Sequence, residues 1–238
     1  MSLLELQGVS KRFGGLMANQ DISFSVDAGQ IVGLIGPNGA GKTTAFNCVA
    51  GFYTPSAGEI RLDGQVISGL PPEACARAGV GRTFQVARTF TSMTACENVM
   101  AGALLRNRRV AAARDAAMQW LAFVNLDRFA DKPAGSMTIS EQRRLAVARA
   151  LAIAPKLLLM DEVMAGLNPS EVREMVAVVL NIRERGIACL IVEHVLEGIM
   201  PIADKIVVLD RGVKIADGTP AEVQRNEDVI RAYLGTEA

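Results

Sequence analysis

A glycine-rich stretch, GLIGPNGAGKTT, follows a short apolar run at residues 31–35 and fits the pattern GxxxxGK[ST]. Glycines at Gly36 and Gly41 let backbone N–H groups curl around phosphate oxygens. Lys42 supplies a positive charge for the outer phosphates, and Thr43 supplies a hydroxyl for Mg²⁺. The stretch therefore predicts a nucleoside triphosphate site, because an incidental lysine in a glycine-rich turn would not need the strand before it and the helix after it. The predicted binding residues are Gly36, Pro37, Asn38, Gly39, Ala40, Gly41, Lys42, Thr43 and Thr44.

Two carboxylates, Asp161 and Glu162, end the apolar run LLLMDE. A carboxylate at the C-terminal end of a buried strand can hold Mg²⁺ and its waters, which predicts that role for Asp161. Glu162 would then take the proton from a water attacking the γ-phosphate, or orient that water. The alternative is a pair of solvated turn acids, which the phosphate-binding pattern upstream disfavours.

The chain contains one histidine, His194, directly after the apolar run of LIVEH. A lone histidine is commonly structural. Its place at a strand end matches that of the two other phosphate-facing elements, so we expect His194 to contact the γ-phosphate.

Short apolar runs alternate with longer helical patterns and predict the elements that position these residues. IVGLI, LLLMD, CLIVE and KIVVLD lie at 31–35, 157–161, 189–193 and 205–210, which is typical of βαβ units with a mostly parallel sheet. EIRLDGQVI and IVVLDRGVKIADG turn at Asp63-Gly64 and at Asp210–Gly212, so both predict antiparallel hairpins.

Strand signals vanish between about residues 87 and 150, where Ala, Leu, Arg and Met dominate. These residues favour helices, so the segment predicts a helical insert in the α/β core. We expect Trp120, Leu121 and Phe123 to pack this insert and not to form a ligand site.

Composition restricts the function classes. The 238 residues carry 25 basic and 25 acidic side chains, so a basic surface for nucleic acid is not expected. The scattered cysteines predict buried, reduced thiols; they are Cys48, Cys75, Cys96 and Cys189. No signal peptide and no apolar run long enough to cross a bilayer is present, which predicts a cytoplasmic protein that reaches a membrane only through partners.

Taken in order, GPNGAGKTT, TFQ, the 137–149 stretch, LLLMDEVMAGLNP and IVEH resemble the ATP-binding subunits of ABC transporters along essentially the whole chain. The resemblance implies one ABC ATPase domain over residues 1–238, with ATP and Mg²⁺ as cofactors. It comprises a P-loop NTPase core and an N-terminal antiparallel β subdomain (1–86 and 151–238), and a helical subdomain (about 87–150). It also implies that Gln85 of TFQ reaches Mg²⁺ and the attacking water while sensing a transmembrane partner. Phe13 of KRFGG is similar to the aromatic that stacks on adenine, although a core phenylalanine is the alternative.

Within that family, GFYTPSAGEI, GVGRTFQVARTF, AGLNPSE and EDVIRAYLG resemble the ATPase subunits of branched-chain amino-acid importers. This implies ATP hydrolysis at the cytoplasmic face of the membrane, in complex with permease subunits, for import of branched-chain or other small amino acids. A second ATPase subunit would complete a homo- or heterodimer, and a periplasmic or extracellular solute-binding protein would act indirectly. The alternatives are an importer of urea, amides or organic acids, or a regulatory subunit that binds ATP and hardly hydrolyses it.

The segment MTISE, residues 137–141, occupies the place of the family's L-S-G-G-Q signature, which contacts the γ-phosphate held by the opposite subunit. Thr138 keeps a hydroxyl and should form a capping box with Glu141. Ser140 adds a Cβ, and Glu141 adds a charge whose repulsion is of order a few kcal/mol unless Arg143 or Arg144 neutralises it. We therefore expect a weak signature, and in a heterodimer hydrolysis mainly at the site that contains this chain's phosphate loop. A simple helix start without nucleotide contact is the alternative.

Overall fold

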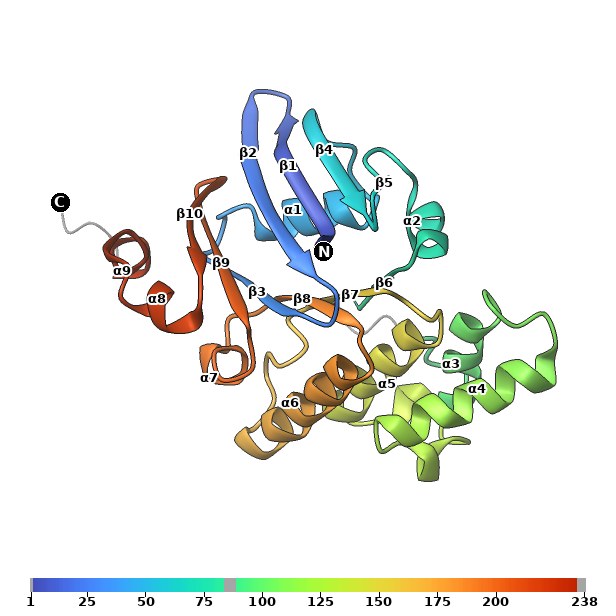
Figure 1. Cartoon of the computed structure of the whole chain (residues 1–238). Coiled ribbons are helices and arrows are strands. Elements are labelled where there is room, and N and C mark those ends of the chain that lie inside the picture. The colour runs from blue at the N-terminus through green and yellow to red at the C-terminus, as the bar shows by residue number, and fades with distance from the viewer. Residues whose placement is uncertain (1, 84–88, 235–238) are drawn as a thin grey trace.

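The chain folds into two β-sheets with helices between and around them in the computed structural model, which describes residues 2–83 and 89–234 (Figure 1). The smaller sheet is antiparallel with the order β2-β1-β4-β5. Its strands are β1 (Ser2–Phe13), β2 (Leu16–Asp27), β4 (Ala57–Leu62) and β5 (Gln65–Val66). The resemblance implied this N-terminal sheet, and the structure confirms it.

The larger sheet has the order β10-β9-β3-β8-β7-β6, and all of its neighbours are parallel except β9 and β10. Its strands are β3 (Ile31–Ile35), β6 (Val80–Arg82), β7 (Leu157–Asp161), β8 (Ala188–Val192), β9 (Lys205–Asp210) and β10 (Val213–Gly218). The predicted parallel strands are confirmed, with β8 one residue earlier than expected at each end. The short edge strand β6 was not predicted, because its three residues, Val-Gly-Arg, carry too little pattern.

Both predicted hairpins are present. β4 pairs with β5 and β9 pairs with β10, each antiparallel. At their turns Asp63 and Gly64 have φ values of 50° and 74°, and Arg211 and Gly212 have values of 45° and 83°. Two consecutive residues of positive φ form the turn that suits the twist of a two-residue hairpin, which explains the Asp-Gly and Arg-Gly sequences.

The parallel sheet is buried on both faces by two different sets of residues. Val32 and Leu34 of β3 pack with Phe46 of α1 (Lys42–Val49) and with the antiparallel sheet. Ile31 and Ile35, whose side chains alternate with these, pack with the helices on the opposite face. The remaining core helices are α2 (Pro72–Ala78), α6 (Pro169–Glu184), α7 (Leu196–Ile199), α8 (Pro220–Gln224) and α9 (Glu227–Leu234). This two-sided burial explains the nearly uninterrupted apolar composition of the parallel strands.

A group of helices lies at one end of the molecule beyond β6 and β7 (Figure 1). It contains α3 (Ala95–Ala103), α4 (Val110–Phe123) and α5 (Ile139–Leu151), with short 3₁₀ turns at Asp127–Phe129 and Ala134–Ser136. Leu121 is fully buried, and the half-buried rings of Trp120 and Phe123 meet edge to face with centroids 5.5 Å apart. The prediction that these residues pack the insert is confirmed.

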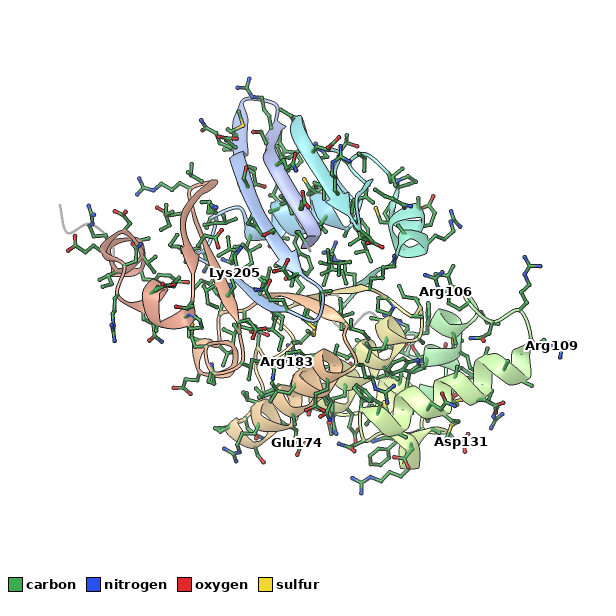
Figure 2. All side chains as sticks on the ribbon, viewed as in Figure 1. Arg106, Arg109, Asp131, Glu174, Arg183 and Lys205 are labelled. Carbon is green, nitrogen blue, oxygen red and sulfur yellow. The ribbon has the colours of Figure 1, made fainter. Side chains whose placement is uncertain are left out.

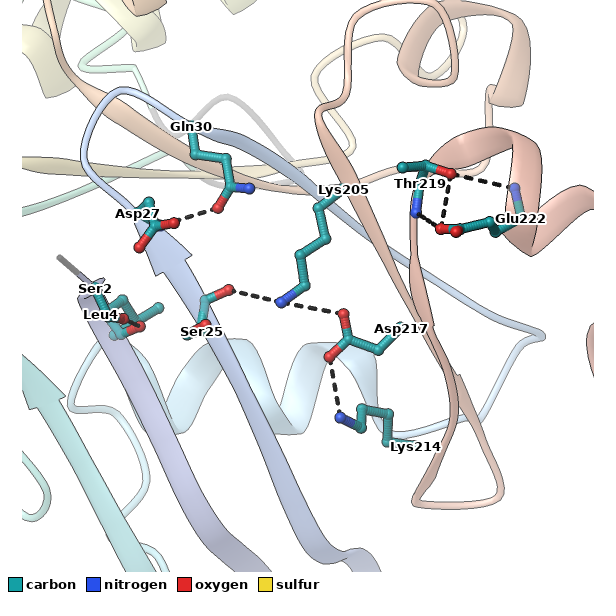
Figure 3. Close-up of polar contacts among 10 residues, drawn as sticks. All are labelled: Ser2, Leu4, Ser25, Asp27, Gln30, Lys205, Lys214, Asp217, Thr219 and Glu222. Atoms are coloured by element: carbon teal, nitrogen blue, oxygen red, sulfur yellow. Dashed lines mark hydrogen bonds and ion pairs between the residues drawn. The ribbon is translucent and has the colours of Figure 1, made fainter.

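Polar side chains fasten peripheral segments to the core. The Lys205 Nζ donates to the Ser25 carbonyl at 3.2 Å and lies 3.0 Å from Asp217 Oδ1, which ties the β9–β10 hairpin to β2 (Figure 3). Arg106 lies beyond the end of α3 (Figure 2). Its Nε donates to the Ile153 carbonyl at 2.7 Å. This hydrogen bond links the loop after α3 to the chain that follows α5.

The four cysteines are buried free thiols, as the sequence predicts. Within residues 2–83 and 89–234, none of the helices combines the length and the apolar character that crossing a bilayer requires.

Two glycines of positive φ test how closely the antiparallel sheet is packed. A Cβ on Gly58 (φ 81°) would lie 2.2 Å from the Gly8 carbonyl oxygen, whereas one on Gly64 (φ 74°) would meet nothing within 4 Å. We expect Gly64→Ala to lower the free energy of unfolding by about 1 kcal/mol, the cost of the left-handed backbone. Gly58→Ala adds a backbone clash and should cost about 3 kcal/mol or more. Urea denaturation measures the free energy of unfolding of the two variants. Equal losses would contradict the close packing described at Gly58.

Candidate functional site

The predicted phosphate loop connects β3 to α1, and its positions require glycine for different physical reasons. A Cβ on Gly36 would lie 2.0 Å from the Leu209 carbonyl oxygen, and one on Gly41 would lie 2.4 Å from Asn19 Nδ2. These two glycines are required because the loop packs tightly on the protein itself. Gly39 has a φ of 79° and nothing within 4 Å of its Cβ position. At Gly39 the loop is therefore open to a ligand, which refines the expectation that all of these glycines serve phosphate approach.

Helix α1 begins without a side-chain cap, as do α2, α4 and α7. Its N-cap is Gly41, which has no side chain to accept a hydrogen bond from the first turn. In contrast, α3, α5, α6 and α8 each begin with a complete capping box, at Thr94, Thr138, Asn168 and Thr219 (Figure 3 shows the last of these). The first N–H groups of a helix need acceptors, and together with the helix dipole they favour an anion. The start of α1 is thus suited to phosphate.

Lys42 is 5% exposed, and its ammonium lies across the loop. The Nζ donates to the carbonyl oxygens of Gly36 at 2.7 Å and Pro37 at 2.9 Å. Burial lowers the pKa of Lys42, and the carboxylates of Glu162 and Asp161 partly oppose this effect. A positive charge is therefore held where the loop would receive phosphate.

The ends of β7 and β8 bring Glu162 and His194 together. Asp161 pairs with Val192 in the sheet, and the Glu162 N–H donates to the Val192 carbonyl at 2.8 Å. The His194 Nε2 lies 3.0 Å from Glu162 Oε1. Because two parallel strands end at the same level, residues 32 positions apart form one polar pair at the sheet edge.

A single cleft of about 620 Å³ contains most of the predicted residues. It is lined by Asn38 to Thr44 of the phosphate loop and α1, by Glu162 and His194, and by Phe13. Phe13 is 40% exposed and meets Tyr53 edge to face, with ring centroids 5.1 Å apart. One face of an exposed aromatic ring at the rim of a phosphate cleft is a surface on which a base can stack.

Asp161 lies deeper than Glu162 and is 5% exposed. Burial raises the pKa of Asp161, whereas Arg82, whose Nη2 lies 3.6 Å from Asp161 Oδ2, opposes that increase. The Thr43 hydroxyl and the Asp161 carboxylate are oxygen donors of the kind that Mg²⁺ prefers, and Mg²⁺ commonly takes few protein ligands beside substrate phosphates and water. The residues present therefore fit Mg²⁺, although no group of three metal-binding side chains occurs in the described chain. Gln85, the third predicted ligand, lies outside the described residues.

The altered signature begins α5 as a capped helix. The Thr138 Oγ1 accepts from the Glu141 N–H at 3.2 Å, and the Glu141 carboxylate accepts from the Thr138 N–H at 2.9 Å. The predicted capping box is thus confirmed. Ser140 is 5% exposed and Ile139 is 65% exposed, so the first turn presents Ile139 and not Ser140 to solvent. Among the described residues that line the cleft, none comes from α5.

Lys132 neutralises the charge of Glu141. Its Nζ lies 2.9 Å from Glu141 Oε2. Burial alone would raise the pKa of Glu141, but the hydrogen bonds from Lys132 and from the Thr138 backbone outweigh it and leave that pKa lowered. The hydrogen-bonded partner of Glu141 is therefore Lys132, and the charge of Arg144, one of the two arginines that the sequence suggested, adds a smaller effect in the same direction.

Three charged residues near the site were not assigned from the sequence, namely Arg82, Arg143 and Glu193. Glu193 is fully buried, and its Oε1 accepts from the Met164 N–H at 2.7 Å. Arg143 donates to the Glu162 carbonyl. The sequence offered one signal for these residues, which was Glu193 at the end of the apolar run CLIVE. An acidic side chain buried beside a strand requires a partner.

Comparisons with known proteins match nearly the whole chain. The family model described as ABC transporter matches residues 19–165, and a second, described as Branched-chain amino acid ATP-binding cassette transporter, matches residues 213–238. The chain is 44% identical to the high-affinity branched-chain amino acid transport ATP-binding protein BraF of Pseudomonas aeruginosa, over 98% of both chains. It is 41% identical to LivG of Escherichia coli K12, a protein of the same description, over 98% of both chains.

A more distant relative serves a different cargo. The lipopolysaccharide export system ATP-binding protein LptB of Escherichia coli K12 is 36% identical, over 99% of this chain and 98% of the relative. Among solved structures, the fold matches the ADP conformation of MJ1267, an ATP-binding cassette of an ABC transporter, with a TM-score of 0.90 and 28% identity. That match covers 99% of both chains.

Burial of Glu193 predicts a pH-dependent stability. Desolvation raises the pKa of Glu193 from its ordinary value of 4.5 to about 7. The folded state therefore binds the proton more tightly than the unfolded state, and this stabilisation is lost as the pH rises from 4.5 through 7. Glu193→Gln removes the titration and so does not suffer this loss. Its free energy of unfolding relative to that of the wild type should therefore rise by about 3 kcal/mol as the pH is raised from 4.5 to 8.

Denaturation at the two pH values measures this difference. Glu73→Gln, which changes an exposed glutamate of α2, serves as the control and should follow the wild type at both pH values. A Glu193→Gln variant with the same pH dependence as the wild type would contradict the prediction.

Proposed function

The chain belongs to the ABC transporter family of ATP-binding subunits, and from that premise we propose that it binds Mg·ATP in the cleft beside α1 and hydrolyses it to drive import of branched-chain amino acids. The observation that carries the proposal is that the uncapped start of α1 and the Glu162–His194 pair line one cleft. A phosphate chain bound by α1 would place its terminal phosphate toward that pair.

We assign the binding roles from the geometry of the cleft. The N–H groups of residues 38–44 and the Lys42 ammonium bind the phosphates, and Phe13 stacks on the base. Thr43, Asp161 and Gln85 would hold Mg²⁺, which when bound neutralises charge on the phosphate oxygens. Arg82 supports this arrangement, because its charge favours the ionised form of Asp161 in spite of burial.

Glu162 acts as the general base or orients the attacking water. His194 donates from Nε2 to Glu162 Oε1, which fixes the direction of the carboxylate and leaves the imidazole at the phosphate end of the cleft. Catalysis in this arrangement consists of positioning and charge neutralisation, as is usual for phosphoryl transfer. The presence of both residues in contact favours an active ATPase over a regulatory subunit that only binds ATP.

The start of α5 would complete the site of a second ATPase subunit through Thr138 and Ser140. Lys132 removes most of the repulsion that Glu141 would exert on that subunit's phosphates. The electrostatic reason for expecting a weak signature is therefore reduced. A dimer that uses the α5 start in both sites is compatible with this charge balance, as is a heterodimer.

We assign the cargo from the relatives. BraF and LivG are branched-chain amino acid transport proteins at 44% and 41% identity, and LptB, which serves lipopolysaccharide export, is less similar at 36%. The branched-chain family model at residues 213–238 supports the same choice over importers of urea, amides or organic acids. The partners are permease subunits at the cytoplasmic face of the membrane, a second ATPase subunit and, through the permease, a solute-binding protein.

Two substitutions separate binding from hydrolysis. Lys42→Ala should weaken ATP binding about tenfold or more, because charge-assisted hydrogen bonds contribute about 1.5–3 kcal/mol each. Glu162→Gln should leave ATP binding intact and lower turnover about 10²–10⁴-fold, the range of general acid–base catalysis. Lys156→Ala, which removes an exposed partner of Asp63, is the matched control. ATP binding and ATPase activity are measured on the complex with its permease, and unchanged ATP binding by Lys42→Ala would overturn the proposed site.

The role of Lys132 is tested by rescue. Lys132→Met leaves Glu141 charged without its partner, so turnover of the assembled complex should fall about five- to tenfold, as expected for a few kcal/mol of repulsion reduced by screening. Adding Glu141→Gln to the same chain removes the charge and should restore most of the loss. An unchanged turnover in Lys132→Met, or no recovery in the double variant, would count against a role for α5 at the phosphate of the partner.

A further inference from the structure

Glu162 has a backbone conformation that its own residue type disfavours. Its φ is 50°, in the left-handed region where a Cβ crowds the following peptide. Such a residue persists only where its surroundings hold it, and in functional sites it is often part of the mechanism. The N–H of Glu162 is held by the Val192 carbonyl of β8 at 2.8 Å. A second set of hydrogen bonds holds the Glu162 carbonyl.

The Glu162 carbonyl is held from a different part of the molecule. It accepts a hydrogen bond from Nη1 of Arg143 on α5, and a longer one of 3.3 Å from the Ala165 N–H. Helix α5 packs against α3 and α4, so the guanidinium belongs to the group of helices beyond the parallel sheet. Arg143 thus connects that group directly to the peptide of the proposed catalytic base.

Glu193 lies on the far side of the same turn. Its fully buried carboxylate accepts from the Met164 N–H at 2.7 Å, two residues after Glu162, and His194 follows it directly in the chain. Burial lowers the pKa of Arg143, and the carboxylates of Glu193 and Glu162 oppose this effect, so the charges are close enough to interact. Glu193 therefore fastens the turn after Glu162 to the segment that carries His194, and the charge of Arg143 partly opposes the burial that raises the pKa of Glu193.

We propose that Arg143 is a positioning residue for ATP hydrolysis, which fixes the Glu162 peptide from α5 and, together with Glu193, aligns Glu162 with His194. The proposal rests on the proposed function, because it needs Glu162 to act on the attacking water. A displacement of α5 would move the Arg143 guanidinium and so misalign the Glu162 carboxylate. A misplacement of about 1 Å at a reacting group can cost on the order of 10²-fold in rate.

The alternative is that Arg143 only stabilises the fold by neutralising buried Glu193. The two roles differ in what they do to kinetics. Loss of a positioning contact lowers kcat and leaves the KM for ATP nearly unchanged, because ATP binding depends on the phosphate loop and not on the Glu162 peptide. Loss of a purely stabilising pair lowers the melting temperature and leaves kcat per folded molecule unchanged.

The experiment uses the chain in its complex with the permease and compares Arg143→Met with Arg183→Met. Arg183 of α6 is the matched control (Figure 2), because its Nη1 lies 3.6 Å from Asp204 Oδ1, and Asp204 accepts from the Ile31 N–H at the opposite, amino end of β3. We expect Arg143→Met to lower kcat about tenfold or more with KM within about twofold, and Arg183→Met to stay within about twofold in both. Arg143→Lys keeps a charged donor and should recover part of the loss.

A double variant keeps the proposal falsifiable if Arg143→Met is unstable. Adding Glu193→Gln removes the unpaired buried charge and keeps an acceptor for Met164, so the melting temperature should recover. The kcat should stay low, because the Glu162 carbonyl still lacks the hydrogen bond from Arg143. Recovery of kcat together with the melting temperature, or an Arg143→Met kcat equal to that of Arg183→Met, would overturn the proposal.

Glu162→Gln in the same complex separates this proposal from the proposed function. If Glu162→Gln retains turnover, the role of Glu162 fails and the Arg143 proposal fails with it. If Glu162→Gln is inactive and Arg143→Met matches the control, only the positioning role of Arg143 is overturned.

Discussion

The structure depends on the parallel pairing of β3, β8 and β7. Leu34 and Asp161 both pair with Val192, so the three strands reach their carboxyl ends at the same level. Their interiors are apolar and buried, and polar residues follow only where the strands end. One edge of the sheet therefore collects the phosphate loop, the Asp161–Glu162 pair and His194. Ligands bind at this edge in open α/β sheets for the same geometric reason.

Charge buried at this edge is balanced by residues from several segments. Lys42 lies near Asp161 and Glu162, Arg82 pairs with Asp161, and Arg143 interacts with Glu193. An isolated buried charge would be costly, so each of these groups requires its partner. The charged residues at the strand ends therefore interact as one group. It restricts how β6, β7, β8 and α5 can sit relative to one another, which relates the helical insert to the chemistry of the cleft.

Residues 137–141 depart from the family signature, and local and long-range contacts accommodate different parts of this departure. The capping box is local and keeps the helix start intact in spite of Ser140 and Glu141. The ion pair with Lys132 comes from the turn before the helix and compensates the added negative charge. The altered segment is therefore consistent with a working nucleotide contact, because both changes are accommodated inside this chain.

The sequence alone determined what depends on neighbouring residues and on alternation. The phosphate loop, the parallel strands around residues 31–35, 157–161, 189–193 and 205–210, both hairpin turns and the capping box at Thr138 were all predicted because their patterns are local. The short strand β6 was not, since three residues carry too little pattern. Only the tertiary structure decided that Lys132 pairs with Glu141, that Arg143 holds the Glu162 carbonyl, and that Glu193 anchors Met164. These contacts join separate elements, and their partners are set by how α5 and the strand ends pack, which no local pattern specifies.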